Sequence, residues 1–270
     1  MDVSEPLDEA IPAATLVLLR ERPGGPPDLL MLERAGGMAF AAGALVFPGG
    51  RVDPGDHALA ADPSLAGPQE DREEAAARIA AIRETIEEVG IAIGLAPAPD
   101  AAALAGLRAA LAAGEDFAGL LRAGGWRLDL AALVPFARWR PNFREARRFD
   151  ARFYLARASG ADVARADGGE SVRALWTTAS DALADADAGR HHIIFPTRRN
   201  LERLAGFASF EAACADAARF PVETITPWIE ERAGERWLCI PDDRGYPVTA
   251  EPLATARRGL PPAFNPPPRP

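Results

Sequence analysis

Three glutamates, Glu84, Glu87 and Glu88, lie within five residues of one another. Positions spaced by three and four residues share one face of an α-helix, so all three carboxylates would gather on one side. Carboxylates held this close repel one another unless a cation joins them. Magnesium and manganese are the natural candidates, because hard divalent ions take carboxylate oxygens as ligands. The cluster predicts a metal-assisted reaction, although a solvated helix face would explain the same three residues taken alone.

A helix over residues 70–90 would carry these glutamates. An apolar stripe runs along it, formed by Ile79, Ile82, Ile86 and Val89. At about 100° per residue, the mean direction of the three carboxylates lies roughly 170° from that stripe. We therefore expect the helix to bury its isoleucines, to present its glutamates on the opposite side and to stop at Gly90.

The preceding segments predict a strand framework that ends in two glycines. Apolar runs at 13–19, 29–33 and 44–47 are typical of buried strands, and the first two are separated by a Pro- and Gly-rich turn that favours a hairpin. The third run leads into Gly49 and Gly50. We expect a tight turn there, since glycine lets the backbone approach a metal or phosphate closely.

The rest of the chain predicts smaller elements. One or two short helices are expected within 97–124. Strands are expected at 130–140, 148–158 and 172–177, and helices at 178–183, 197–204 and 209–218. A closing hairpin is predicted from 224–230 and 236–240, joined through Ala233 and Gly234. No internal repeat interrupts this order, so one elaborated α/β domain is favoured over two.

Composition narrows the classes of function. The net charge of −9 argues against a general nucleic-acid binder, which usually needs a basic face. No apolar run reaches the length of a membrane span and the N-terminus lacks a secretory pattern, which favours a cytoplasmic enzyme. The sequence contains no lysine, so Schiff-base and P-loop lysine chemistry are excluded. Cys214 and Cys239 show no metal-ligand spacing; they could form one disulfide, but free buried thiols are expected in a reducing compartment.

Two parts of the sequence together resemble the signature of the Nudix hydrolases, Gx5Ex7REUxEExGU, in which U is a bulky aliphatic residue. Gly50-x5-Asp56 matches the first part, with Asp in place of Glu. Arg83-Glu84-x2-Glu87-Glu88-x-Gly90-Ile91 matches the charged residues, the glycine and the last aliphatic place of the second, while Thr85 stands at its first aliphatic place, next to Ile86. The approach Val46-Phe47-Pro48-Gly49-Gly50 is also similar to the family's.

The signature is split by an insertion. Residues 57–82 separate Asp56 from Arg83, 26 residues where the pattern has seven. A subgroup of the family carries such an insertion, and the chain is similar to its coenzyme A diphosphatases. The insertion could shape the substrate entrance or merely lengthen the helix, and the sequence leaves both readings open.

The resemblance implies a fold and a domain plan. We expect a Nudix-type α/β/α sandwich with a mixed sheet, with helical insertions and a C-terminal hairpin extension. Residues 1–12 would be a lead-in, 13–260 a single Nudix domain with its insertion at 57–82, and 261–270 a Pro-rich tail.

The resemblance also implies an activity, the hydrolysis of a phosphoanhydride bond in a nucleoside diphosphate linked to another moiety, with Mg²⁺ or Mn²⁺. Coenzyme A or acyl-CoA is the preferred substrate. ADP-ribose, a dinucleotide or a nucleoside triphosphate is the enzymatic alternative, and a non-catalytic nucleotide-sensing module is an alternative of another class. The partner is thus a small molecule, with neither nucleic acid nor membrane. A homodimer is one of the oligomeric states left open.

Residue roles follow from the same resemblance. Glu87 and Glu88 would be the main metal ligands, with Glu84 a ligand or the base that accepts the proton of water. The Gly50 carbonyl would complete the coordination. Arg83 would anchor an acidic partner such as Asp56 and so fix the direction of the glutamates.

Three further assignments compete with simpler readings. Glu170 is a candidate ligand, against an exposed loop acid. Arg198 and Arg199 follow a Pro-Thr helix start where a substrate phosphate could bind, against ordinary surface arginines. His191 and His192 have no nearby residues to complete a metal site, so a packing or surface role is favoured for them.

Overall fold

The computed structural model describes residues 10–36, 43–140 and 148–256, and the elements below are those of these ranges. The strands are β1 (Ile11–Arg22), β2 (Gly25–Arg34), β3 (Leu45–Val46), β4 (Gly49–Arg51), β5 (Leu95–Ala96), β6 (Arg127–Leu128), β7 (Val134–Trp139), β8 (Phe149–Arg157), β9 (Ser171–Thr178), β10 (Thr224–Ile225), β11 (Trp228–Arg232), β12 (Glu235–Cys239) and β13 (Ala250–Pro252). The helices are α1 (Pro54–Ala60), α2 (Pro63–Ala66), α3 (Arg72–Val89), α4 (Ala101–Ala112), α5 (Phe117–Gly124), α6 (Ala179–Asp187), α7 (Phe195–Leu204), α8 (Phe210–Arg219) and α9 (Leu253–Ala256), with a 3₁₀ turn η1 (Leu130–Ala132).

A mixed sheet forms the centre of the molecule. Its order is β10-β7-β8-β1-β2-β3, with β4 on β1 and β9 on β2. β1 runs parallel to β8 and antiparallel to β2, so the expected first hairpin is formed. Alternate residues of β1 enter opposite cores: Leu16 and Leu18 face one, and Val17 and Leu19 the other. Burial on both faces explains why the first strand is a continuous apolar run.

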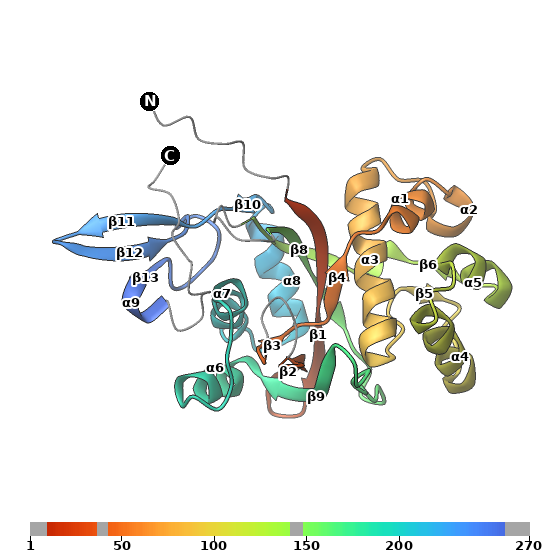
Figure 1. Ribbon diagram of the computed structural model, residues 1–270, viewed down its shortest axis with the longest axis horizontal. Helices are drawn as coiled ribbons and strands as arrows, with labels where there is room; N and C mark the ends of the chain where they lie inside the picture. Colours follow the sequence, from red (N-terminus) through yellow and green to blue (C-terminus); the bar gives the residue numbers. More distant parts are fainter. Residues whose placement is uncertain (1–9, 37–42, 141–147, 257–270) are drawn as a thin grey trace.

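Helices cover both faces of the sheet and complete three layers. On one side α3 packs its isoleucines into the core, with α1, α2, α4 and α5 beyond it (Figure 1). On the other side lie α6, α7 and α8, which contribute to the second core. The prediction of an α/β/α sandwich with a mixed sheet is therefore confirmed.

The insertion 57–82 is helical. It comprises most of α1, all of α2 and the first half of α3. Leu59 and Leu65 of the two short helices are buried in the same core as the isoleucines of α3. Two helices also occupy 97–124, as expected, and the short pair β5–β6 flanks them.

Four segments differ from the prediction. Residues 130–132 form the 3₁₀ turn η1, so the strand expected at 130–140 begins only at Val134. Gly49 and Gly50 lie in a short strand, β4, rather than in a turn, because β4 pairs antiparallel with β1. Thr224 and Ile225 pair with β7 at the edge of the main sheet, so the closing hairpin begins only at Trp228. β13 adds an unexpected third strand to that hairpin.

Most of the terminal residues in the predicted domain plan are not described by the structure. Residues 1–9 and the tail 261–270 lie outside the described residues. Ile11 and Pro12, assigned to the lead-in, belong to β1 because they pair with Phe149 and Asp150 of β8. Cys214 and Cys239 are free thiols, as expected, but only Cys239 is buried and Cys214 is half-buried. Among the described residues, no helix has the length and apolar character needed to span a bilayer.

Candidate active site

Helix α3 carries the glutamates at its C-terminal end. It starts at the N-cap Asp71, whose side chain accepts the amide of Glu74, and ends at Gly90, which adopts the left-handed conformation with φ 68°. The isoleucine stripe is fully buried, as expected. The opposite side is only partly open to solvent, however, because it faces β4 and α1. Glu88 is 7% exposed, and the side chains of Glu84 and Glu87 are 17% and 28% exposed.

The two glycines of β4 allow this close approach. The Gly49 amide donates to Oε2 of Glu88 at 2.8 Å. A Cβ atom on Gly49 would overlap the backbone of Ala14 in β1, and one on Gly50 would overlap the carboxylate of Glu84. A side chain at Gly49 would push β4 away from β1, and one at Gly50 would displace the carboxylate of Glu84. The pair of glycines therefore brings a strand backbone into contact with the acidic face of the helix.

Arg83 lies at the centre of a charged network. Its Nε and Nη2 donate to the two oxygens of Asp56 at 3.0 and 2.9 Å. Its Nη1 donates to Glu84 at 2.9 Å and to Glu87 at 3.1 Å, and Nη2 also donates to the carbonyl of Arg51. Asp56 is 1% exposed and also accepts the Asp53 amide. The expected pairing of Arg83 with Asp56 is formed, and it docks α1 onto α3.

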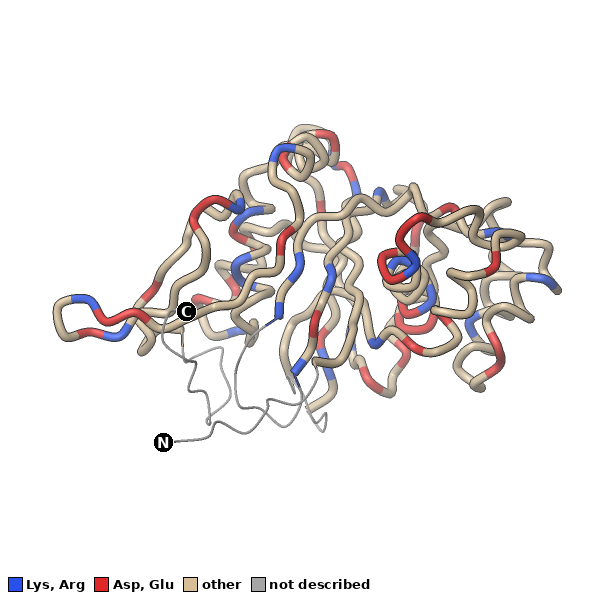
Figure 2. Tube along the Cα trace, turned by 90° about the horizontal axis from the view of Figure 1, so that it is seen from above, with Lys and Arg blue, Asp and Glu red and all other residues tan. Residues whose placement is uncertain are grey.

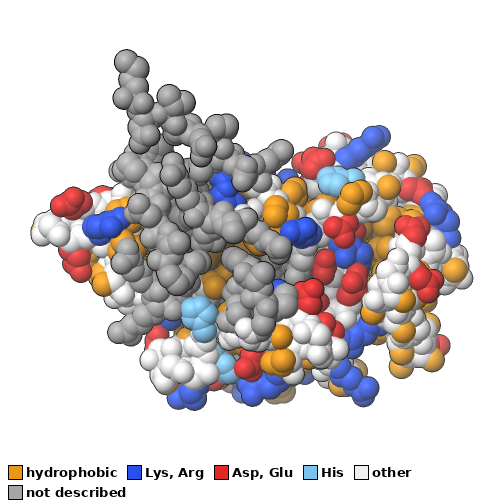
Figure 3. Space-filling view, in the orientation of Figure 1, with side chains coloured by type: hydrophobic (Ala, Val, Ile, Leu, Met, Phe, Trp, Pro, Cys, Tyr) orange, Lys and Arg blue, Asp and Glu red, His pale blue; other side chains and the backbone are white. Residues whose placement is uncertain are grey.

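Two carboxyl groups of the site are poorly solvated. Burial raises the pKa of Glu84 to about 7, with the charge of Arg83 opposing the shift. Burial likewise raises the pKa of Glu88 to about 8, although the hydrogen bond from Gly49 opposes it and the charge of Glu84 adds to it. Both groups thus lack enough positive charge in the metal-free protein. Figure 2 marks acidic and basic positions along the trace of this region, and Figure 3 shows acidic and basic side chains gathered on the surface there.

We predict that the metal-free protein loses stability as the pH rises from about 5 to about 8.5. Both carboxyl groups have folded-state pKa values above their usual 4.5, so the folded chain binds more protons than the unfolded chain. Their contribution is fully present below about pH 4.5 and is lost as the pH rises through about 7 and 8. Calorimetric unfolding with a chelator should show a smaller fall in Tm for Glu88→Gln than for the wild type. Equal falls would contradict the raised pKa.

Arg34 and Glu170 lie beside the buried glutamate. Arg34 ends β2, and its Nη2 is 3.6 Å from a carboxylate oxygen of Glu170. The charge of Arg34 lowers the pKa of Glu88, and that of Glu170 raises it. The side chain of Glu170 is 63% exposed, so it borders the acidic cluster rather than completing it. The sequence analysis did not single out Arg34 as a site residue, because nothing distinguishes it from any other residue that follows a predicted strand.

The donor set fits a divalent cation. The groups are carboxylate oxygens, two of them with a pKa raised by burial, and the carboxylate of Glu84 lies against the backbone of Gly50, where a Cβ would otherwise stand. The side chains do not already converge: within 10–36, 43–140 and 148–256, no three Asp, Glu, His or Cys residues stand at metal-binding spacing. Arg83 holds Glu84 and Glu87, and Gly49 holds Glu88. Rotation of these side chains away from Arg83 and Gly49 is needed for a shared ion.

The remaining candidates lie on the other side of the sheet. Arg198 and Arg199 belong to α7, which packs in the second core. Arg199 is 1% exposed and ion-paired with Glu202 and Glu251. Arg198 pairs with Asp187. The structure does not bring these arginines to the glutamates of α3.

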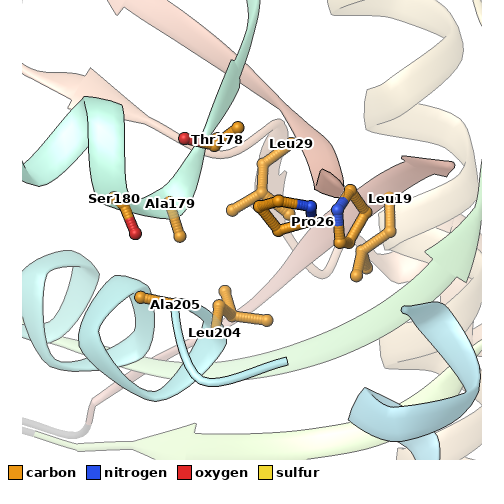
Figure 4. A pocket seen from close by; sticks show the side chains of 9 residues that line it. Leu19, Pro26, Leu29, Thr178, Ala179, Ser180, Leu204 and Ala205 are labelled. Carbon is orange, nitrogen blue, oxygen red and sulfur yellow. The ribbon is translucent and has the colours of Figure 1, made fainter. Parts of the chain in front are cut away.

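Two more features of that side lie away from the glutamates. His192 serves the fold through its backbone carbonyl, which accepts the amide of Leu45. A small cavity between the β1–β2 hairpin and helices α6 and α7 is lined mainly by apolar residues such as Leu19, Leu29 and Leu204 (Figure 4). It contains no charged side chain that would suit a nucleotide.

Comparison with known proteins identifies the family. No protein-family model and no curated protein matches the chain. Among solved structures, a NUDIX hydrolase from Alicyclobacillus acidocaldarius is 30% identical over 77% of this chain and 96% of its own, with a TM-score of 0.67. An Ap4A hydrolase from C. elegans is 21% identical (66% and 87% covered, TM-score 0.35). The NUDIX domain of Shewanella oneidensis NrtR, complexed with ADP ribose, is 13% identical (73% and 89% covered, TM-score 0.41). On the strength of the first match and of the glutamate helix facing its two glycines, the chain belongs to the Nudix hydrolase family.

Proposed function

We propose that this enzyme hydrolyses a phosphoanhydride bond in a nucleoside diphosphate linked to another moiety, with Mg²⁺ or Mn²⁺ as its cofactor. The observation that carries the proposal is the pair of poorly solvated carboxyl groups, Glu84 and Glu88, whose pKa values are raised by desolvation next to the backbone of Gly49 and Gly50. Such desolvation costs stability, and it is repaid when cations bind. Nudix hydrolases typically depend on divalent metals, which agrees with this donor set.

Each residue has a proposed role. Glu87 and Glu88 hold the cation, the Gly50 carbonyl adds a ligand, and Glu84 is either a further ligand or the base that takes the proton of the attacking water. Bound there, a divalent cation neutralises charge on the diphosphate and lowers the pKa of water. Arg83 keeps its two hydrogen bonds to Asp56 and so holds the helix face in place when Glu84 and Glu87 turn toward the ligand.

Arg34, beside the glutamate cluster of α3, would supply positive charge for the substrate. The side chain of Arg34 is 15% exposed, and within the described part of the chain its buried Nε has no hydrogen-bond partner. Its nearest opposite charge there is Glu170, at 3.6 Å. We assign Arg34 the role of contacting a phosphate oxygen of the substrate, for which a guanidinium is well suited. Glu170 is kept as a weaker candidate ligand. Arg198 and Arg199 have no part in this proposal, because their charges are already paired.

The preferred substrate is coenzyme A or an acyl-CoA, cut to an adenosine bisphosphate and a phosphopantetheine. This choice rests on the similarity of the split signature to the subgroup with an insertion. ADP-ribose, a dinucleotide and a nucleoside triphosphate are the enzymatic alternatives. The intact set of glutamates favours an enzyme over a nucleotide-sensing module.

Product analysis tests the proposal. The purified protein is incubated with coenzyme A, ADP-ribose, a diadenosine polyphosphate and a nucleoside triphosphate, each with Mg²⁺, with Mn²⁺ or with a chelator. We expect metal-dependent turnover, with coenzyme A giving the two product masses named above. Turnover of another member instead would reassign the substrate. Tight binding of one of these compounds without turnover of any of them would show that the protein is a nucleotide sensor and not an enzyme.

A further inference from the structure

The carbonyl groups at the end of α3 all have partners. A helix leaves its last four carbonyls without intrahelical donors, and these must be satisfied from outside. Here the Gly90 amide donates to Ile86, and the amide of Arg165 donates to Val89 at 3.1 Å. The two carbonyls between them belong to Glu87 and Glu88, the glutamates of the site.

One guanidinium serves both glutamate carbonyls. Arg108 of α4 donates from Nε to the carbonyl of Glu87 at 2.9 Å and from Nη2 to that of Glu88 at 2.8 Å. Its approach depends on Gly90, where a Cβ would stand 3.2 Å from Nη1. Two fork-like donors on adjacent carbonyls fix the rotation as well as the position of the last helical turn. A cation at a helix C-terminus also interacts favourably with the helix dipole.

The same guanidinium reaches the segment that leads to Glu170. Nη2 of Arg108 also donates to the carbonyl of Arg165 at 2.8 Å, so Arg165 binds both the helix end and Arg108. Five residues later, the Glu170 carbonyl accepts the amide of Ala35, next to Arg34. Asp167 holds the amide of Glu170 with its side chain at 3.0 Å. Arg108 thus joins the backbone behind Glu87 and Glu88 to the segment on the other side of the acidic cluster.

We propose that Arg108 is a positioning residue, which sets the last turn of α3 and the 165–170 segment in the relative placement that the glutamates need to bind a divalent cation. The inference rests on the proposed function of those glutamates. Arg108 touches neither substrate nor metal, and it acts through the backbone of Glu87 and Glu88. A displacement of about 1 Å at such a site costs on the order of 100-fold in rate.

The test compares Arg108→Met and Arg108→Lys with the wild type and with Arg127→Met. Arg127 is an exposed arginine of β6, so its loss serves as the matched control. Mn²⁺ affinity is measured without substrate, by calorimetry or electron paramagnetic resonance. kcat and KM are measured with the substrate found to turn over. We expect Arg108→Met to weaken Mn²⁺ binding and to lower kcat by about tenfold each, with KM changed less than about threefold. Arg108→Lys should recover only part of both losses. It keeps the positive charge, but one ammonium group cannot reproduce the two-donor fork.

The outcomes separate four cases. A folded Arg108→Met with wild-type Mn²⁺ affinity and kcat overturns the inference, whatever its Tm. If that variant does not fold, Arg108→Lys decides, and an unchanged Mn²⁺ affinity overturns the inference again. A wild type that binds Mn²⁺ but turns over no diphosphate refutes the proposed function alone, because the metal-binding comparison still tests Arg108. A wild type that binds no Mn²⁺ refutes both.

Discussion

Replacing Glu88 by Gln is expected to lower kcat by at least about 100-fold while leaving the Tm of the metal-free protein unchanged or higher. The activity falls because the neutral amide is a poor ligand for a divalent cation. The stability is kept because Gln fills the same space and its oxygen still accepts the Gly49 amide. At alkaline pH the variant should be more stable than the wild type, because a buried carboxylate whose pKa is raised to about 8 is replaced by a neutral group.

Glu87→Gln should lose activity to a similar degree but gain less stability. The Glu87 side chain is 28% exposed and already accepts a hydrogen bond from Arg83, so its charge is better compensated than that of Glu88. Mg²⁺ should raise the Tm of the wild type more than that of either variant, because ligands that bind the folded state stabilise it.

Glu73→Gln is the matched control for both variants. Glu73 lies in the first turn of the same helix with a side chain that is 67% exposed, and the substitution makes the same change of charge away from the glutamate cluster. Its kcat and its response to Mg²⁺ should equal those of the wild type. Should Glu88→Gln and Glu87→Gln both keep more than about a third of the wild-type kcat, the metal ligands have been assigned to the wrong residues.

The helix that carries the glutamates could be predicted from the sequence because its signal is local. The spacing of Ile79, Ile82, Ile86 and Val89 marks its buried face, and Gly90 marks its end. The β1–β2 hairpin has the same kind of local signal. Where the spacing of apolar residues agrees with the residues that begin and end an element, a short stretch of sequence is enough to predict it.

The surroundings of the glutamates depend on contacts between distant parts of the chain. Gly49 and Gly50 have no strand propensity, and they are extended only because β1, more than 30 residues earlier in the chain, pairs with them. Arg108 belongs to an Ala- and Leu-rich helix whose sequence does not indicate what its one arginine contacts. Arg199 was considered for phosphate binding, yet it is buried and ion-paired with Glu251 of β13, a three-residue strand too short to be predicted.

Asp56→Ala is expected to lower the free energy of unfolding by about 3 kcal/mol, the lower end of the cost of breaking a buried ion pair. Asp56 is 1% exposed and accepts two hydrogen bonds from Arg83 and one from the Asp53 amide. Each of these three donors loses an acceptor when the carboxylate is removed. Arg83 keeps Glu84 and Glu87 as partners, which limits the loss. Urea unfolding at pH 7 measures the effect.

The control is an exposed aspartate–arginine pair, Asp185 with Arg190, whose members are 33% and 60% exposed. Asp185→Ala should cost less than about 1 kcal/mol, because solvent screens such pairs. In a double-mutant cycle, Asp56→Ala combined with Arg83→Met should cost less than the two single changes added together, since each already breaks the pair. Full additivity, or a cost for Asp56→Ala no larger than that of Asp185→Ala, would refute the role of this pair in docking α1 onto α3. The buried pair would then not be what ties the inserted helices to the helix that carries the glutamates.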